Sequence, residues 1–533
     1  MSGEIKTNLF REAAKIGAEK HPRKSTKTVG YGTAGFRTKA ETLDHVMYRM
    51  GLLAVLRSKT KGATIGAMVT ASHNPVEDNG VKIVDPLGEM LVQHWEKIAT
   101  DLANVSDDNL EECLLEIVKN EKINTDAAAS VFIGMDTRPS NIELSNALKE
   151  GVTAVGGEIH DWGVVTTPML HYFVAAKNSG LTPSKENYYR KLVDNFRTLR
   201  SKNSSSGNYV PEILFDGANG VGALIMKELI PLLDGLLTIK PYNNGEGKLN
   251  YHCGADFVKV EQQQPEGVPE VRLARCVAVD GDADRIVYFF TDDNNKFHLL
   301  DGDRIATLVA GYLMDLVRES GLSLRLGLVQ TAYANGNSTK YISQTLHVPV
   351  VCVPTGVKHL HHKAQEFDIG VYFEANGHGT VLFGQKADEL IIKSAADSSN
   401  DAAQQLLATM KLINQATGDA LSDLLLVEAV LSARGWSVMD WAAAYTDLPN
   451  KLLKVTVKDR NLIKTADAER KCVSPLGLQD RVDQLVSQYP SGRAFIRPSG
   501  TEDVVRVYAE ADTREHCDEL AQKVAEAVSE FTV

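Results

Sequence analysis

Short apolar runs alternate along the chain with amphipathic stretches of helical length. The runs lie at 63–70, 131–135, 213–215, 276–279, 326–331 and 350–353. The candidate helices lie at 141–155, 303–318, 401–416 and 514–531. Strands that alternate with helices are typical of βαβ units, and fully apolar strands are typical of parallel sheets buried on both faces. The pattern therefore predicts an α/β fold with mainly parallel sheets.

Three breaks in this pattern divide the chain. They are the polar loop 201–208, the acidic turn 291–296 and the segment 435–455 ahead of a β-rich stretch. A chain of 533 residues is expected to form three or four domains. We predict four domains, at 1–190, 191–297, 298–440 and 441–533.

Charge and composition exclude several classes of protein. The 57 lysines and arginines face 69 aspartates and glutamates, for a net charge of −12. This balance argues against binding to nucleic acids or membrane surfaces, which are themselves anionic. The sequence has no apolar run long enough to span a membrane. Its six cysteines are scattered without a C-x-x-C pair, which favours reduced thiols and a cytoplasmic location.

The first candidate site, here called the serine loop, is 70–75 (TASHNP). It follows an apolar strand, and the end of a parallel strand is where α/β folds place active sites. The Asn74–Pro75 step forces a turn, so Ser72 is expected on a rigid, exposed loop. A helix N-cap or an ordinary turn serine is the alternative. The surrounding residues do not form a G-x-S-x-G elbow, so they do not indicate a hydrolase.

The second candidate, the aspartate loop, is 280–285 (DGDADR), directly after the run 276–279. Three carboxylates this close repel one another unless a cation lies among them, and hard oxygen ligands suit Mg²⁺. An EF-hand would need glycine and glutamate where the chain has Arg285 and Thr291. A haloacid-dehalogenase loop of the form D-x-D-x-T would need threonine at Asp284. A solvated acidic turn is the remaining alternative.

Two later loops carry ligand-binding residue types. The arginine loop, 497–503 (RPSGTED) with Arg506 beyond it, offers guanidinium forks, hydroxyls and a glycine to a phosphate that is held and not transferred. The glutamate loop, 374–380 (EANGHGT), has polar residues at alternate positions that suit sugar hydroxyls. Each loop alone is also consistent with an ordinary polar turn.

Weaker signals lie elsewhere. Arg37 ends a glycine-bearing stretch, 31–37, and Lys82 lies ten residues after Ser72. The segment 354–358 (PTGVK) is another short polar turn. The sequence shows no P-loop, protein-kinase signature or G-x-G-x-x-G dinucleotide loop.

Taken together and in this order, the loops resemble those of the α-D-phosphohexomutase superfamily over nearly the whole chain. Within it, the chain is most similar to the phosphoacetylglucosamine mutases of eukaryotic type. Only 34 residues separate Arg37 from Ser72, and the glutamate loop has Asn376 where glucose- and mannose-type mutases have serine. The resemblance implies three doubly wound α/β domains with mixed sheets and a C-terminal α+β domain around a central cleft, with one loop from each domain.

The resemblance also implies roles for individual residues. Ser72 would carry the phosphoryl group. The implied metal ligands are Ser72, Asp280, Asp282 and Asp284. Arg37, Lys82 and His378 would serve proton transfer or phosphate stabilisation, with the acid and base left open. The implied substrate-binding residues are Thr355, Gly356, Glu374, Asn376, His378, Arg497, Ser499, Gly500, Thr501 and Arg506. His73, Asn74 and Arg285 would complete the site.

The implied activity is interconversion of N-acetylglucosamine 6-phosphate and 1-phosphate through phosphoserine and a sugar 1,6-bisphosphate. It would require Mg²⁺ and the bisphosphate as activator, and would feed UDP-N-acetylglucosamine synthesis. We expect a monomer or weak homodimer. The alternatives are a phosphoglucomutase or phosphomannomutase, a phosphohydrolase, and a catalytically silent sugar-phosphate binding protein.

Overall fold

The computed structural model describes residues 2–32, 35–202, 207–499 and 503–532. The chain forms two compact units. Unit 1 comprises Met1–Asn203, Val210–Leu299 and Lys411–Ala429, and unit 2 comprises Ser204–Tyr209, Leu300–Met410 and Val430–Val533. No helix within the described residues is long and apolar enough to cross a bilayer.

The first sheet of unit 1 carries the serine loop. Its strands, in the spatial order β1-β3-β2-β4-β5, are β1 (Phe36–Lys39), β3 (Asp78–Val84), β2 (Ile65–Val69), β4 (Ser130–Met135) and β5 (Glu158–Val164). Strands β2, β4 and β5 run parallel, while β3 is antiparallel to β1 and β2. The associated helices are α1 (Ser2–Lys20), α2 (Asp44–Lys61), α3 (Gln93–Asn104), α4 (Leu110–Asn120), α5 (Asn141–Ala154) and α6 (Thr167–Asn178). Helix α7 (Lys185–Lys202) follows and hydrogen-bonds through Tyr188 to Asp419 and through Tyr189 to Glu228.

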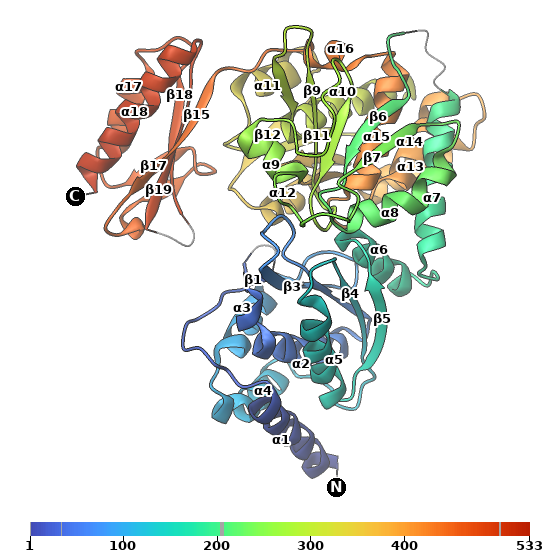
Figure 1. Cartoon of the computed structure of the whole chain (residues 1–533), viewed down its shortest axis with the longest axis vertical. Coiled ribbons are helices and arrows are strands. Elements are labelled where there is room, and N and C mark those ends of the chain that lie inside the picture. Colours follow the sequence, from blue (N-terminus) through green and yellow to red (C-terminus); the bar gives the residue numbers. More distant parts are fainter. Residues whose placement is uncertain (1, 33–34, 203–206, 500–502, 533) are drawn as a thin grey trace. The chain divides into compact units, whose positions relative to one another are not determined.

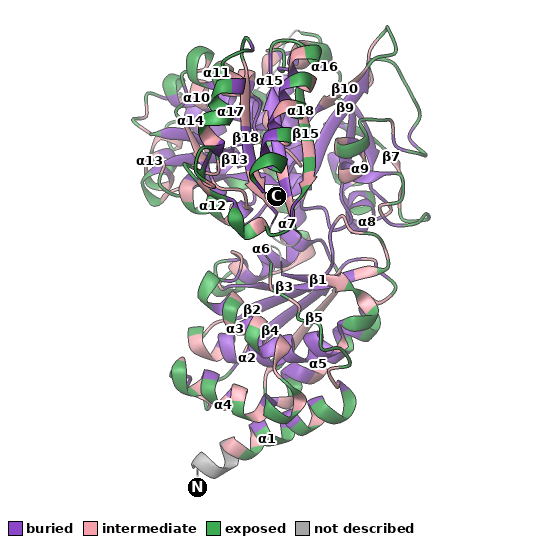
Figure 2. Ribbon diagram, turned by 90° about the vertical axis from the view of Figure 1, so that its left-hand side faces the viewer, coloured by how far each residue is buried: buried purple, intermediate pink, exposed green. Residues whose placement is uncertain are grey.

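Helices cover both faces of this sheet because its strands are apolar at successive positions. Ala67 and Ile133 belong to the core that α2 and α5 close, and these two helices lie side by side in Figure 1. The alternate positions Met68 and Gly134 face α6, where Leu170 lies against Gly134. Figure 2 shows the central strands β2, β3 and β4 buried and the outward face of α4 exposed, whereas the edge strand β5 is partly exposed. The expectation of strands buried on both faces is thus confirmed.

The second sheet of unit 1 carries the aspartate loop. Its order is β10-β9-β8-β6-β7, with strands β10 (Phe297–Leu300), β9 (Ile286–Thr291), β8 (Cys276–Val279), β6 (Glu212–Asp216) and β7 (Thr238–Tyr242). Its helices include α8 (Val221–Leu229) and α9 (Gly254–Glu261). The segment 411–429, far along the chain, packs here through a fully buried ion pair between Arg275 and Glu428 (2.6 Å).

Unit 2 begins with a four-stranded mixed sheet of order β12-β11-β13-β14. The strands are β12 (Val350–Val353), β11 (Leu326–Thr331), β13 (Ile369–Phe373) and β14 (Gly379–Phe383). Helices here are α10 (Gly302–Glu319), α11 (Gly336–Lys340), α12 (Val357–Ala364), α13 (Gln385–Ala395), α14 (Asp401–Leu412) and α16 (Val438–Ala442). Helix α15 (Ala420–Arg434) belongs to unit 1 up to Ala429. The loops after β12, β11 and β13 leave the same edge of the sheet, because these strands are parallel.

The C-terminal part of unit 2 is α+β. An antiparallel sheet of order β15-β19-β18 contains β15 (Asn450–Thr456), β19 (Val504–Glu510) and β18 (Arg493–Pro498). A hairpin of β16 (Lys464–Ala466) and β17 (Lys471–Ser474) and the helices α17 (Leu478–Val486) and α18 (Arg514–Phe531) complete it. Residues Ile496 and Val507 pack in the core with α17 and α18, which leaves the other sheet face for polar residues.

The predicted elements agree with the structure except at one helix end. The six apolar runs coincide within two residues at each end with β2, β4, β6, β8, β11 and β12. The helix expected at 401–416 ends at Leu412 instead. There the Asn414 side chain accepts a hydrogen bond from Ala416 N and donates one to Pro168 O, so this polar residue competes with continued helix.

Candidate active site

The structure places Ser72 against the aspartate loop, although the two are far apart in the sequence. The expectation of an exposed Ser72 is wrong, because the aspartate loop packs against it and leaves it only 2% exposed. Its Oγ donates a hydrogen bond of 2.6 Å to Asp280 Oδ2. Its φ of +52° lies in the left-handed region, which is uncommon for a residue with a Cβ and persists only where the surroundings impose it. The Ser72 backbone N–H donates to Thr70 Oγ1. The hydroxyl is therefore held in one orientation toward Asp280.

A single arginine holds the backbone of the serine loop. The buried Arg138 guanidinium donates to the carbonyls of Ser72 and Asn74 at 3.0 and 2.9 Å, and to those of Pro75 and Asp78. Arg138 is itself paired with the buried Asp136. Asn250 Nδ2 also donates to the Ser72 carbonyl, at 2.9 Å. These donors explain how a strained serine backbone is maintained.

The aspartate loop approaches the serine loop closely because of its small residues. It follows β8, and a Cβ on Gly281 would lie only 2.7 Å from the Ser72 carbonyl oxygen. Any larger residue at Gly281 would push the two loops apart. Ala283 has a φ of +58°, in the left-handed region, and so turns the backbone between Asp282 and Asp284.

The three aspartates fit a hard divalent cation. All three are buried, and ligand oxygens from Asp280, Asp282 and Asp284 lie within 4.8 Å of one another. Asp282 Oδ1 is buried and has no hydrogen-bond partner among the described residues. Burial, followed by the neighbouring carboxylates of Asp284 and Asp282, raises the pKa of Asp280 well above its ordinary value. An oxygen-only donor set with an unused buried carboxylate oxygen is suited to Mg²⁺.

Lys82 on β3 and Thr167 at the start of α6 form hydrogen bonds with these aspartates. Lys82 Nζ donates to Asp282 Oδ2 at 2.9 Å and to Asp284 Oδ2 at 2.8 Å. Burial disfavours its charge, but the two carboxylates more than offset this and raise its pKa, so Lys82 is an ammonium. Thr167, at the start of α6, donates its hydroxyl to Asp282 Oδ2 at 2.6 Å and its N–H to Asp282 O. Both contacts leave Asp282 Oδ1 for a metal.

Cationic side chains surround Ser72. Arg37 Nη1, on β1, donates to Asn74 Oδ1 at 3.2 Å and lies 3.5 Å from His73 Nδ1. Arg285 Nε lies 3.9 Å from carboxylate oxygens of Asp280 and Asp284. Burial, then Arg285 and Arg37, lowers the pKa of His73 to about 2, so His73 is a neutral ring beside Ser72 Oγ. Positive charge is thus concentrated locally within an acidic chain.

The glutamate loop is the turn between β13 and β14 in unit 2. Asn376 Nδ2 contacts Glu374 Oε2 at 3.4 Å, and His378 N donates to Asn376 Oδ1 at 2.9 Å. Glu374 and Asn376 are half-buried, and His378 is buried. The three predicted residues therefore form one hydrogen-bonded turn.

The arginine loop runs from the end of β18 to the start of β19 in unit 2, and the two predicted arginines are neighbours on these strands. Arg497 on β18 pairs in register with Arg506 on β19, and both are half-buried. Arg497 Nε donates to Glu469 Oε1 at 2.9 Å, and the Glu469 carboxylate also accepts from Thr355 N and Oγ1. Thr355 and Gly356 precede α12, and Ser499 is buried. Gly500 and Thr501 lie outside the described residues.

Sequence reasoning missed four residues that hold these sites. Arg138 belongs to 136–140 (DTRPS), which follows the run 131–135 as the serine loop follows its own strand, so position could have pointed to it. Thr167 is flagged by Thr166 and Pro168 as part of a helix start, but nothing local connects it with Asp282. Asn250 and Glu469 carry no local signal.

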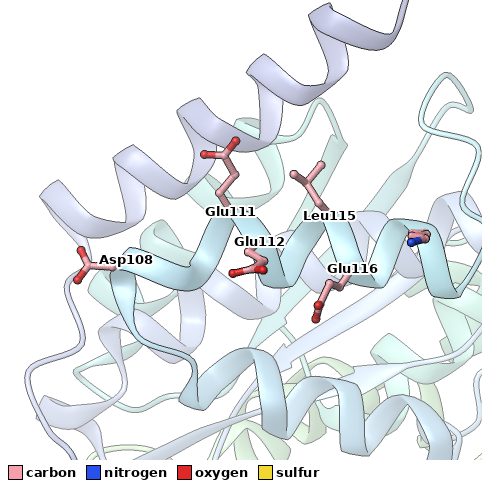
Figure 3. A pocket seen from close by; sticks show the side chains of 6 residues that line it. Asp108, Glu111, Glu112, Leu115 and Glu116 are labelled. Carbon is pink, nitrogen blue, oxygen red and sulfur yellow. The ribbon is translucent and has the colours of Figure 1, made fainter.

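A shallow pocket on α4, of about 370 Å³, is a different kind of surface. Figure 3 shows it along one side of that helix. Its lining residues are Asp108, Glu111, Glu112, Leu115, Glu116 and Lys119. Four carboxylates against one lysine would repel a sugar phosphate, so this pocket is not a candidate substrate site.

Comparisons with known protein families cover most of the chain. Residues 301–436 match "Phosphoacetylglucosamine mutase AMG1, domain III" and residues 181–287 match domain II of the same family. Residues 52–109 and 108–184 match "Phosphoglucomutase/phosphomannomutase, alpha/beta/alpha domain I", and residues 452–527 match the C-terminal domain of that family. The four-domain phosphohexomutase architecture is therefore present in this chain.

Whole-chain comparisons agree. Human phosphoacetylglucosamine mutase is 54% identical over 516 residues, 95% of this chain and 95% of its own. The crystal structure of Aspergillus fumigatus N-acetylphosphoglucosamine mutase with GlcNAc-6P and magnesium has a TM-score of 0.93 and 47% identity, covering 98% of this chain and 99% of its own. A serine-to-alanine variant of that protein with glucose 1,6-bisphosphate has a TM-score of 0.91 at the same identity and coverage. By sequence and fold, this chain belongs to the phosphoacetylglucosamine mutase family of the α-D-phosphohexomutase superfamily.

Proposed function

We propose that this protein is a phosphoacetylglucosamine mutase, an isomerase that interconverts N-acetylglucosamine 6-phosphate and N-acetylglucosamine 1-phosphate. The single observation that carries the proposal is the 2.6 Å contact between Ser72 Oγ and Asp280 inside a buried trio of aspartates. Membership of the family, and relatives solved with GlcNAc-6P, magnesium and glucose 1,6-bisphosphate, support this substrate, cofactor and activator.

In this proposal Ser72 carries the phosphoryl group. The bond between Ser72 Oγ and phosphorus breaks as phosphorus bonds to the free hydroxyl oxygen of the bound sugar monophosphate, and that hydroxyl loses its proton to a base. Ser72 Oγ takes up a proton as the phosphoryl group leaves it, so the product is the 1,6-bisphosphate with unmodified Ser72. After the bisphosphate turns around, Ser72 Oγ loses its proton to a base and bonds to the phosphorus of the other phosphate. The bond between that phosphorus and the sugar oxygen breaks, and the sugar oxygen takes up a proton to give the isomeric monophosphate. Such transfer depends mainly on positioning and charge stabilisation.

The charges around Ser72 suit such a phosphorylated intermediate. Phosphoserine carries nearly two negative charges, and the three aspartates add three more. Lys82, Arg37 and Arg285 supply three positive charges within this site. Mg²⁺, held by Asp280, Asp282 and Asp284, would supply the remaining two and stabilise charge on the transferred group. The buried, charged Lys82 fits a stabilising role better than that of a base.

The binding residues of unit 2 are assigned by chemistry. Glu374, Asn376 and His378 would hydrogen-bond sugar hydroxyls. Arg497, Arg506 and Ser499 would hold the phosphate that does not react, as a guanidinium pair suits a dianion. Gly500 and Thr501 remain assigned by motif alone. The proposal also includes four domains, at 1–190, 191–297, 298–440 and 441–533. It includes a cytoplasmic role in UDP-N-acetylglucosamine synthesis, and a protein that is a monomer or a weak homodimer.

A coupled isomerase assay tests the proposal. The purified chain is supplied with N-acetylglucosamine 6-phosphate, glucose 1-phosphate or mannose 1-phosphate, with catalytic bisphosphate, and with or without Mg²⁺. We expect the acetylated sugar to be preferred and turnover to require Mg²⁺. A strong preference for a plain hexose phosphate would indicate a phosphoglucomutase or phosphomannomutase instead. Release of free phosphate without isomer would indicate a hydrolase, and absence of phosphate on Ser72 by mass spectrometry would indicate a silent binding protein.

A further inference from the structure

One face of the C-terminal sheet gathers like charges in a single row. The register pairs Arg497 on β18 with Arg506 on β19, and Arg506 with Lys454 on β15. Directly opposed residues of antiparallel strands project from the same face, so three cations lie side by side. Like charges in this arrangement repel each other, and a nearby anion reduces that repulsion.

The structure supplies that anion from within the chain. Glu469 lies in the turn between β16 and β17, and its Oε1 accepts from Arg497 Nε at 2.9 Å. Its Oε2 accepts from Thr355 N at 2.9 Å and Thr355 Oγ1 at 2.5 Å. Both members of the ion pair are largely shielded, with side-chain exposures of 21% for Arg497 and 18% for Glu469. Burial disfavours the charge of Arg497, but the Glu469 carboxylate more than offsets this and raises the pKa of Arg497.

The donors around Glu469 are those that proteins use for phosphate. A guanidinium N–H, a backbone N–H and a hydroxyl converge on its two oxygens. The turn that presents it is itself unusual, since Asp467, Ala468 and Glu469 have φ values of +51°, +54° and +66°. Three successive left-handed residues without glycine are strained and persist only when surrounding contacts impose them. The contacts of Glu469 with Arg497 and Thr355 are such contacts.

We propose that Glu469 is an internal substitute for the substrate's non-reacting phosphate: it occupies Arg497 in the free enzyme and is displaced when that phosphate binds. The proposal rests on the phosphate-holding role of Arg497 in the proposed function. A phosphate monoester has nearly two charges and three acceptor oxygens, whereas the carboxylate has one charge and two. The phosphate therefore wins the exchange, but breaking the Glu469–Arg497 pair weakens its apparent affinity. Glu469 thereby determines how tightly substrate is held.

The decisive variant is Glu469→Gln, which keeps the shape of the side chain and an oxygen for Thr355 but removes the charge. With the full chain and N-acetylglucosamine 6-phosphate, we expect KM to fall about threefold to tenfold, as expected for removing a partly shielded ion pair. The inhibition constant of inorganic phosphate should fall by a similar factor. Asp467→Asn is the matched control, because Asp467 is in the same turn but pairs with the exposed Arg470. It should leave both constants unchanged.

Comparison with Arg497→Ala separates the role of Glu469 from the phosphate-holding role of Arg497. In an Arg497→Ala background, Glu469→Gln should have no further effect on KM, because the guanidinium for which Glu469 and the phosphate compete has been removed. An unchanged or higher KM in Glu469→Gln, while Arg497→Ala still raises KM, would overturn the role of Glu469 alone. An Arg497→Ala variant with unchanged KM would overturn both this role and the phosphate-holding site. Should Glu469→Gln not fold, Glu469→Ala gives the same readout, since it also removes the charge.

Discussion

The serine–aspartate region of unit 1 and the arginine region of unit 2, each proposed to bind a phosphate, differ in how firmly their side chains are fixed. Around Ser72, the serine and the three aspartates are buried, and other residues fix them: Arg138 and Asn250 hold the serine backbone, and Lys82 and Thr167 hold Asp282. Around Arg497, the side chains are half-exposed, and a carboxylate from the same chain occupies the arginine.

The difference follows from what each region must bind. A phosphoryl group that is transferred needs reacting atoms held within a fraction of an ångström, which a rigid, buried scaffold provides. The region that holds the other phosphate must accept a sugar in either of two orientations. Long, partly exposed arginines can adapt to both. The four predictions below test this contrast, beginning with the largest effect.

Ser72→Ala should lower mutase turnover by at least about 10⁴-fold, because no other group takes over the removed nucleophile. The measurement is the coupled isomerase assay, with thermal unfolding to check the fold. Ser25→Ala, at an exposed position, is the control and should retain full activity. Substantial residual turnover in Ser72→Ala would show that the phosphoryl group is carried elsewhere.

Asp282→Asn should lower turnover about 10³-fold, since a metal ligand stabilises the transferred charge by several kcal/mol. The variant also removes one of the two carboxylates that pair with Lys82. A titration of activity with Mg²⁺, after removal of bound metal with a chelator, should show a strongly raised requirement. Asp293→Asn, in an exposed turn of the same sheet, should behave like the unmodified protein. Equal Mg²⁺ requirements in the two variants would contradict the metal assignment.

Arg497→Ala should lower kcat/KM about 10-fold to 100-fold, mainly through KM, because a charged hydrogen bond to phosphate is lost. An adaptable region that holds either phosphate should show the same loss with the 6-phosphate and the 1-phosphate as substrate. Arg481→Ala, on the exposed side of α17, controls for loss of charge. A loss confined to one isomer would indicate that Arg497 serves only one substrate orientation.

The sequence predicts the first region better than the second. A strand followed by a loop marks both Ser72 and Asp280, and strand ends of α/β sheets lie where sites form, so local pattern and motif were sufficient. The residues that hold these side chains in place could not be predicted in this way. Thr167 reaches Asp282 only through tertiary packing, and Glu469 reaches Arg497 from a turn without glycine or proline. Contacts of this kind arise from the fold and have no local sequence signature.

The last prediction tests whether the rigid geometry around Ser72 depends on Thr167, a residue whose contact with Asp282 has no local sequence signature. Thr167→Val keeps the shape of the side chain but removes the 2.6 Å hydrogen bond to Asp282 Oδ2. A hydrogen bond to a charged group contributes about 1.5–3 kcal/mol, so the Mg²⁺ concentration for half-maximal activity should rise about tenfold.

Thr166→Val is the matched control for Thr167→Val. Thr166 caps α6 through Met169 N, so its loss should lower the melting temperature while leaving the Mg²⁺ requirement unchanged. A raised requirement in Thr166→Val alone would mean that the position of α6 as a whole, and not the hydroxyl on Asp282, sets metal affinity. Should neither variant change it, Lys82 and the aspartate loop would be sufficient to hold Asp282, and the serine region would need fewer fixed partners than the contrast with Arg497 implies.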